Sequence, residues 1–431
     1  MTARPYRWVV LAAGTAAFST SYLVRQSHTG IGKSLQQDLH LDKAEYGLLG
    51  SAFFYAYAVG QIPWGTLTDR FGGRLTVAGG TLLTGLAIAF FAFVQDLTGA
   101  AGTRIAAGLF SASVFVPMAA VCACWFPSRE RGVANSLYHG VGGGAGQLIA
   151  YSMMPWLAAH PQFHVAGVSG WRGTILVIAA FILGAGLIAA VFMRSRPTEP
   201  VEAEAGPPTE AVSYQKEMRA VFRDHRLWLL AGVFISFTMT IRLVHGWIQI
   251  YAADLLIARR GMSIEQAQVS AAVVGICMVV GQMVGEPWYG RVSDAALQRG
   301  IARGWMMAAS LAAKVVAFFV LMVPVANPWF YAAIGFVIGA VGNSAPVVSA
   351  AASEFFGARV AGFAMGVVNT IGQFMGAFVL TLSGWVAINL SKEPGNAIAE
   401  YQPIWWLGIG CSTVGIVSAV RLGMMGRRTT G

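Results

Sequence analysis

Long apolar stretches recur along nearly the whole chain and are separated by short polar segments. Each stretch is close to the roughly 20 residues that a helix needs to cross about 30 Å of hydrocarbon. The pattern predicts twelve membrane-spanning helices, at about 8–30, 44–65, 75–94, 100–124, 132–156, 173–193, 227–252, 266–288, 305–325, 328–350, 360–382 and 404–422. The predicted fold class is therefore an all-α integral membrane protein.

One polar segment, residues 194–226, divides the predicted helices into two sets of six. Its prolines and glutamates give it a composition that cannot bury a core. They are Pro197, Pro200, Pro207, Pro208, Glu199, Glu202, Glu204 and Glu210. We therefore expect an N-terminal six-helix bundle at 1–193, a cytoplasmic linker at 194–226 and a C-terminal six-helix bundle at 227–431.

Composition and charge agree with a membrane protein, because 56% of residues are hydrophobic and 11% are charged. With both termini in the cytoplasm, the inner segments carry 19 of the 29 Lys and Arg and the outer loops carry 6. Cations in short loops are retained on the cytoplasmic side. This predicts a multi-pass protein of the inner (plasma) membrane with both termini inside, and the net charge of +10 then implies no nucleic-acid partner.

The two predicted halves repeat each other. At an offset of 225, Gly60, Gly65 and Asp69 match Gly285, Gly290 and Asp294. At an offset of 230, Arg129, Gly132, Ala134, His139, Gly142 and Gly146 match Arg359, Gly362, Ala364, Asn369, Gly372 and Gly376. At an offset of 220, Leu23, Val24 and Arg25 match Leu243, Val244 and His245. Three matches in chain order indicate a duplicated six-helix unit.

A duplicated six-helix unit resembles the major facilitator carriers, whose substrate site lies near the bilayer midplane between two pseudo-symmetric bundles. Residues 65–74, GTLTDRFGGR, also resemble the signature of that superfamily after the second helix, and include Asp69 and Arg70. The resemblance implies a cytoplasmic gate in which Asp69 faces the helix start near Arg359, and Asp294 the one near Arg129. The alternative is a plain solvated turn.

Four cations fall inside predicted spans: Arg25, Arg104, Arg242 and Lys314. A cation near the centre of a span costs about 2.5 to 3.5 kcal/mol, so some should face a cavity. Polar residues at helical spacing favour this interpretation. They are Tyr22, Arg25, Gln26 and Thr29 in the first helix, Arg242 and His245 in the seventh, Asn135, His139, Gly143, Gln147 and Tyr151 in the fifth, and Asn369 and Gln373 in the eleventh.

No acidic residue falls near the middle of a predicted span, and Glu45, Asp254 and Glu286 lie at span ends. A cavity with cations and no carboxylate predicts an anionic ligand, and Arg forks suit phosphate or carboxylate oxygens. Each candidate has an alternative. Arg25 and Arg242 could instead pair with backbone carbonyls, and His139 could simply be packed.

The other two cations are assigned differently. Arg104 resembles a common superfamily arginine and is expected to be architectural. Lys314 lies in the ninth helix, which is usually peripheral in this fold, and stays open between function and snorkelling.

The runs YLVRQSH at 22–28, IRLVHGW at 241–247 and HGVGGG at 139–144 resemble the bacterial organophosphate:phosphate antiporters. The resemblance implies that Arg25, Arg242 and His139 bind phosphate. This chain departs from that family, because Gln61 stands where those antiporters have a lysine and Trp247 where they have an acidic residue.

The second helix, SAFFYAYAVGQIPWG, resembles instead the anion:cation symporters, which take carboxylates and sugar acids with protons. Tyr57 is compatible with both families. The glutamate that those symporters carry in the fourth helix is absent, with Ser111 nearby.

The sequence therefore predicts a secondary transporter of a small organic anion, a phosphate ester ahead of a carboxylate, that works by alternating access and exchange. A proton-coupled symporter is the first alternative, since Glu286 could lie deeper than its predicted place. A membrane sensor of a sugar phosphate is the second. We expect a monomer in the lipid bilayer, with no enzymatic activity, no cofactor and no metal.

Overall fold

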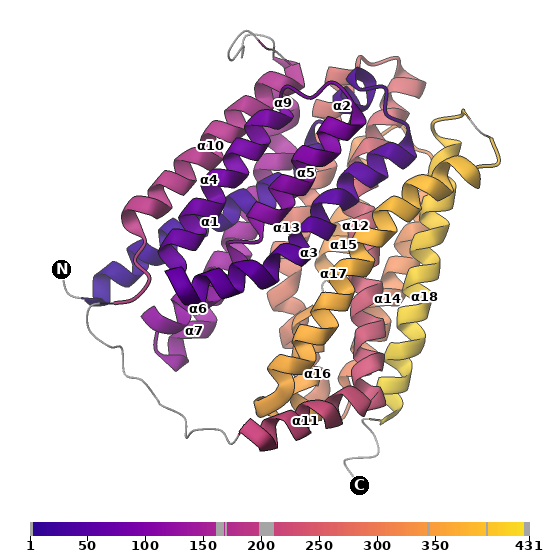
Figure 1. Ribbon diagram of the computed structural model, residues 1–431. Coiled ribbons are helices and arrows are strands. Elements are labelled where there is room, and N and C mark those ends of the chain that lie inside the picture. The colour runs from indigo at the N-terminus through magenta and orange to yellow at the C-terminus, as the bar shows by residue number, and fades with distance from the viewer. Residues whose placement is uncertain are drawn as a thin grey trace. The chain divides into compact units, whose positions relative to one another are not determined.

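The computed structural model describes residues 3–160, 168, 170–197, 211–342, 345–393 and 395–425. These residues form helices joined by short turns, and no β-strand occurs in the ranges described. The chain divides into two compact units, drawn in Figure 1. Unit 1 is Met1–Glu204 with Leu256–Ile276, and unit 2 is Ala205–Leu255 with Cys277–Gly431.

Unit 1 contains the helices of the N-terminal half. They are α1 (Ala3–Gly30), α2 (Gly32–Asp38), α3 (Lys43–Phe71), α4 (Gly73–Phe91), α5 (Leu97–Ser111), α6 (Phe115–Trp125), α7 (Ser128–Ser136), α8 (Gly143–Leu148), α9 (Met154–Ala159) and α10 (Gly170–Phe192), with π-helical stretches η1 (Leu137–Gly142) and η2 (Ile149–Met153). Within the unit, α10 packs on α4, α3 packs on α5, and α1 packs on α8 and η1.

The predicted span at 100–124 is interrupted in the structure, because α5 ends at Ser111 and α6 begins at Phe115. Pro117 lies in the first turn of α6. Proline lacks the N–H for a helical bond, and its ring would clash with the carbonyl four residues earlier. A continuous helix through Ser113 is therefore disfavoured.

The predicted span at 132–156 belongs to a continuous helical run from α7 to α9 that alternates between α and π geometry. Its glycines allow close packing on α1. A β-carbon at Gly146 would collide with the carbonyl oxygen of Ser19, so only glycine fits there. π-Helical turns are rare and occur frequently at functional sites.

Unit 2 contains α11 (Ala211–Arg223), α14 (Arg303–Leu321), α15 (Pro328–Gly342), α16 (Ala345–Phe356), α17 (Ala358–Asn389), the 3₁₀ turn η3 (Ala399–Tyr401) and α18 (Gln402–Met425). It also contains most of α12 (His225–Arg260) and the C-terminal part of α13 (Ile264–Gln298). The hairpin that joins these two helices groups with unit 1.

Helix α11 lies in the segment that the sequence suggested only as a polar linker. It contacts α17 within unit 2, and Figure 1 shows it lying across the ends of the upright helices of that unit. Residues 198–210 of the predicted linker lie outside the described residues.

Eight helical segments in the described ranges are long and apolar enough to cross a membrane. They are Gly73–Phe91, Leu97–Trp125, Gly170–Phe192, His225–Arg260, Ile264–Gln298, Arg303–Leu321, Val360–Asn389 and Ala399–Met425. The other four predicted spans are also helical where described, but they are more polar or shorter. The number twelve thus stays a prediction.

Candidate functional site

Arg25 is held in unit 1 by aromatic rings. Its side chain is 6% exposed, and its guanidinium carbon lies 4.3 Å from the ring centre of Tyr22, 4.8 Å from that of Tyr57 and 5.7 Å from that of Phe54. Ring faces attract the cation but leave its N–H groups without acceptors. Among the described residues, Arg25 Nε has no hydrogen-bond partner and the guanidinium has no carboxylate. This arrangement suits an anionic oxygen ligand.

Arg104, from α5, holds the part of α1 on which Arg25 stands. It is completely buried and donates to the carbonyls of Val24 at 2.8 Å and of Arg25 at 3.4 Å. It also lies 3.2 Å from Nδ1 of His28. These contacts fix the backbone of α1, and the architectural role of Arg104 stays a prediction.

His139 lies in the π-helical stretch η1 and shares an aromatic neighbour with Arg25. Its side chain is exposed, and its ring centre lies 6.1 Å from that of Tyr22 and 5.4 Å from that of Phe18. Glycines on the same helical run, including Gly143 beside the Tyr22 ring, bring this segment close to α1. Tyr22 thus connects two of the predicted ligands within one unit.

Tyr57 and Gln61 stand one turn apart on α3. Tyr57 is 5% exposed and stacks on Phe53 with ring centres 6.0 Å apart. Gln61 is half-buried. The structure therefore brings Tyr57 to Arg25, whereas no contact connects Gln61 to this group in the described part of unit 1.

In unit 2, Arg242 forms a chain of polar contacts with α17. It donates through Nη2 to Oε1 of Gln373 at 3.0 Å, and Gln373 Nε2 donates to Oδ1 of Asn369 at 3.4 Å. The small residue Gly376 faces the Arg242 side chain. Asn369 thus reaches Arg242 through an amide and not directly.

His245 lies one turn beyond Arg242 on α12 and has its own contact. Its Nε2 lies 3.0 Å from Nε2 of Gln282 on α13. Both His245 and Arg242 are 7% exposed. Because an amide NH2 group only donates, this contact makes Nε2 of His245 the acceptor and places the proton of the neutral ring on Nδ1.

Lys314 lies 1% exposed inside unit 2, on α14. Its amine donates to Oγ1 of Thr240 at 3.1 Å and lies 4.5 Å from the ring centre of Phe237. The side chain therefore does not snorkel to a polar surface in this structure. Its hydroxyl partner on α12 lies within one turn of Arg242.

Two of the acids predicted at span ends, Glu286 and Asp254, lie inside longer helices. Glu286 is half-buried inside α13, which continues to Gln298, and has no hydrogen-bond or ion-pair partner in the described part of the chain. Asp254 lies inside α12, which continues to Arg260, and accepts a 2.6 Å hydrogen bond from Tyr401. Both helices extend beyond the apolar stretch that defined their predicted spans, so the position of each acid at a span end stays a prediction.

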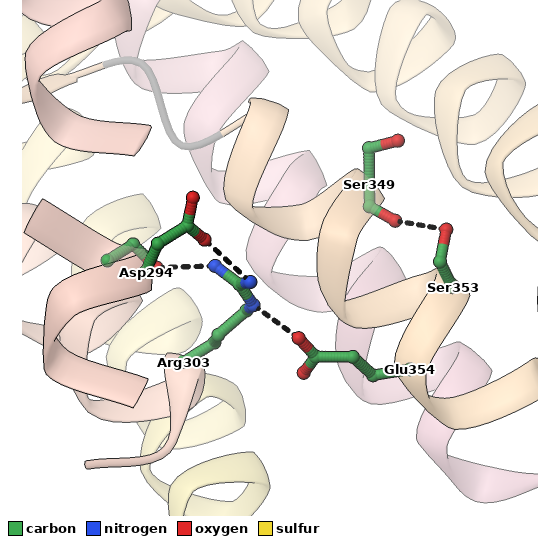
Figure 2. Close-up of polar contacts among 6 residues, drawn as sticks. Asp294, Arg303, Ser349, Ser353 and Glu354 are labelled. Carbon is green, nitrogen blue, oxygen red and sulfur yellow. Dashed lines mark hydrogen bonds and ion pairs between the residues drawn. The ribbon is translucent and has the colours of Figure 1, made fainter. Parts of the chain in front are cut away.

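The predicted gate residues are only partly described. Asp294 accepts from Nη2 of Arg303 at 2.8 Å, and Nε of Arg303 donates to Glu354 at 2.7 Å. Figure 2 shows the Arg303 guanidinium between these carboxylates, from α13 and α16. The side chains of Arg129 and Arg359 lie outside the described set, so their pairing with Asp294 and Asp69 stays a prediction.

The first half has no equivalent of this Arg303 contact in its described part. Asp69 and Arg70 are exposed, and Arg70 lies over the ring of Phe71 at 5.3 Å. Arg74 donates instead to the carbonyl of Ala190 at 2.8 Å. The two repeats therefore share sequence at this turn but not side-chain contacts.

Three polar partners were not assigned to the site from the sequence: Gln373, Gln282 and Arg303. Gln373 carried a signal, since it recurs every fourth residue with Asn369. Gln282 and Arg303 carried none, because an isolated polar residue does not reveal which helix it faces. Among the described residues, no group of three or more His, Cys, Asp or Glu side chains could hold a metal ion.

Known proteins resemble this chain in sequence. Residues 14–380 match the family model of the Major Facilitator Superfamily. The "Probable galactarate/D-glucarate transporter GudP" of Bacillus subtilis is 29% identical over 68% of this chain and 66% of its own length. The "Probable sulfoacetate transporter SauU" of Cupriavidus necator is 23% identical over 72% of this chain and 71% of its own length. The "Probable hexose phosphate transport protein" of Chlamydia pneumoniae is 28% identical over 41% of this chain and 37% of its own length.

Solved structures show the same fold at low identity. A bacterial homologue of the human lysosomal transporter Spinster, in an inward-facing and unoccupied conformation, has a TM-score of 0.74 at 18% identity, covering 99% of this chain and 98% of its own. The nucleoside transporter NupG has a TM-score of 0.69 at 12% identity, covering 98% of this chain and 99% of its own. These likenesses show the fold alone. With the family match over most of its length, the chain belongs to the Major Facilitator Superfamily and is a membrane transporter and not an enzyme.

Proposed function

We propose that this protein carries a small organic anion across the inner membrane by alternating access, with exchange of one anion for another. The observation that carries the proposal is Arg25, a buried guanidinium surrounded by Tyr22, Tyr57 and Phe54 with no carboxylate partner among the described residues. A buried charge of this kind is costly unless a counter-charge arrives, and an anionic substrate would supply it.

The names of the relatives support our proposal for the class of substrate. Those that align over about two thirds of this chain or more are named for galactarate or D-glucarate, sulfoacetate and tartrate. The relative named for hexose phosphate aligns over 41% of it. We therefore place carboxylates and sulfonates ahead of phosphate esters, which reverses the order that the sequence motifs favoured.

The proposed architecture has twelve spans in two pseudo-symmetric six-helix bundles, at 1–193 and 227–431, with both termini in the cytoplasm. Eight of the predicted spans correspond to helical segments that are long and apolar enough to cross a membrane. The other four predicted spans are also helical where they are described, which supports the proposal. We propose Arg242, His245 and Asn369 as further substrate ligands in the second bundle. The proposed residues of the cytoplasmic gate are Asp69, Arg70, Asp294, Arg129 and Arg359.

A proton-coupled symporter is the second candidate, and Glu286 favours it. This half-buried carboxyl lies inside α13 without a partner among the described residues, so it could take up a proton during transport. Glu286→Gln should abolish uptake driven by a pH gradient if the protein is a symporter. It should leave anion exchange unchanged if our first proposal holds.

The binding experiment is a thermal-shift screen of the purified protein against galactarate, glucarate, tartrate, sulfoacetate, hexose 6-phosphates and inorganic phosphate. A ligand at 100 times its Kd should add about 2.7 kcal/mol of stability. Stabilisation by at least one of these anions and by no neutral sugar is the expected result. Stabilisation by neutral sugars alone would contradict the proposal.

A further inference from the structure

Helix α11 presents cations and an aromatic ring on one exposed face. Lys216, Arg219 and Arg223 are exposed and follow a spacing of three and four residues, which places them on one side of the helix. Phe222 is 47% exposed beside them. On the other side, Val221 is 5% exposed, and α11 contacts α17 within unit 2. The two faces of α11 therefore differ: one packs on unit 2 and the other has no protein cover in the described residues.

The exposed face continues onto the first membrane-spanning turn of unit 2. Only Asp224 separates α11 from α12. Trp228, in the first turns of α12, is 46% exposed, and its ring lies 5.4 Å from that of Phe222 in an edge-to-face contact. Its Nε1 donates to the carbonyl of Phe222 at 3.1 Å. Tryptophan at the end of a spanning helix is typical of the level of the lipid headgroups.

We propose that the exposed face of α11 binds the headgroups of anionic lipids in the cytoplasmic leaflet. The three cations complement the charge of phosphatidylglycerol or a similar lipid, and the Phe222–Trp228 pair lies against the start of the acyl chains. A basic amphipathic helix with aromatic residues lies in the membrane interface in this way. The direct continuity with α12, a helix apolar enough to span, keeps α11 within reach of lipid and favours this occupant over a soluble protein.

The position of α11 gives such binding a consequence for unit 2. The guanidinium of Arg226, just after α11, lies 5.6 Å from the ring centre of Phe355 at the end of α16. The preceding residue, Glu354, is held by Arg303 at 2.7 Å (Figure 2). Lipid bound at α11 would therefore restrict motion at the end of unit 2 where Arg303 contacts Asp294 and Glu354.

The test uses the full-length protein in detergent, titrated with phosphatidylglycerol or phosphatidylcholine and followed by native mass spectrometry. The variant K216Q/R219Q/R223Q removes the three cations. The control R259Q/R260Q/K392Q removes three cations from the opposite ends of the helices. Each cation near an anionic surface contributes about 1 kcal/mol, or roughly fivefold in affinity. The α11 variant should lose at least tenfold in affinity for phosphatidylglycerol, and the control should stay within twofold.

A second measurement locates the lipid. Phosphatidylglycerol with brominated acyl chains should quench tryptophan fluorescence more in the wild type than in W228F, and brominated phosphatidylcholine should show a smaller difference. Equal affinities for the two lipids, an unchanged α11 variant or equal quenching in W228F would overturn the proposal. Full competition by soluble glycerol phosphate would also overturn it, because the site would then belong to a free anion.

Discussion

Arg25 is the residue on which the substrate proposal depends most. Tyr22, Phe54 and Tyr57 fix the cation without satisfying its N–H groups. A flexible, point-charged lysine would lack the planar fork that matches a carboxylate. A single side chain thus combines the charge and the geometry that an anionic ligand needs.

Arg25→Gln should therefore weaken anion binding without unfolding the protein. Hydrogen bonds to charged groups contribute about 1.5–3 kcal/mol, which corresponds to roughly a 10- to 100-fold rise in Kd. Arg25→Lys should also raise the Kd. Calorimetric titration with the anion found by thermal shift measures the effect, with Arg260→Gln as an exposed control. A Kd within twofold of the wild type for Arg25→Gln would remove Arg25 from the site.

Lys314 is a buried cation that we expect to have no role in anion binding. Its amine has one hydroxyl acceptor and one ring as neighbours, so its charge is poorly compensated. Replacing a poorly compensated buried charge by an apolar side chain of similar size is often neutral or stabilising. We expect Lys314→Met to keep or raise the Tm and to leave the anion Kd unchanged.

The matched control is Lys392→Met, at an exposed position outside the helices. Thermal unfolding and anion titration of both variants decide the role of Lys314. A folded Lys314→Met protein that has lost binding or uptake would show that the amine takes part in transport.

At the scale of elements, the helical run from α7 to α9 positions His139 through its glycines. A side chain at Gly146 would meet the backbone of Ser19, whereas a side chain at Gly140 would meet open space. Gly146→Val should push α1 and α8 apart and lower stability by about 1–3 kcal/mol.

Gly140→Ala, in the same run, should be tolerated. The yield of monodisperse protein and its Tm measure both effects. Equal stability of the two variants would mean that α1 and α8 do not pack through Gly146 as described.

The sequence predicted most helices well because apolar stretches of about 20 residues are a strong signal. It did not predict the break before Pro117, the π-helical stretches or α11, since these depend on local geometry and on partners distant in sequence. Hydropathy marks where the apolar stretch stops and not where the helix stops, so it did not show that α13 continues past Glu286 to Gln298. The buried cations could be predicted because a charge inside a membrane span has a high free-energy cost. Their partners, such as Gln373 for Arg242, could be identified only from the three-dimensional structure.

At the scale of the whole molecule, the charge of the site connects binding to transport. Among the described residues Arg25 has no carboxylate partner, so an empty carrier would move this cation through its cycle without a counter-charge, which raises the barrier for that step. A bound anion cancels the charge. The loaded protein should therefore alternate faster than the empty one, which is the basis of exchange.

Exchange can be measured as uptake of a radiolabelled anion into proteoliposomes that are either preloaded with the same unlabelled anion or empty. We predict uptake many times faster into preloaded vesicles, with loss of the stimulation in Arg25→Gln. Uptake into empty vesicles that equals uptake into preloaded ones, and that depends on an inward pH gradient, would contradict exchange and establish proton symport.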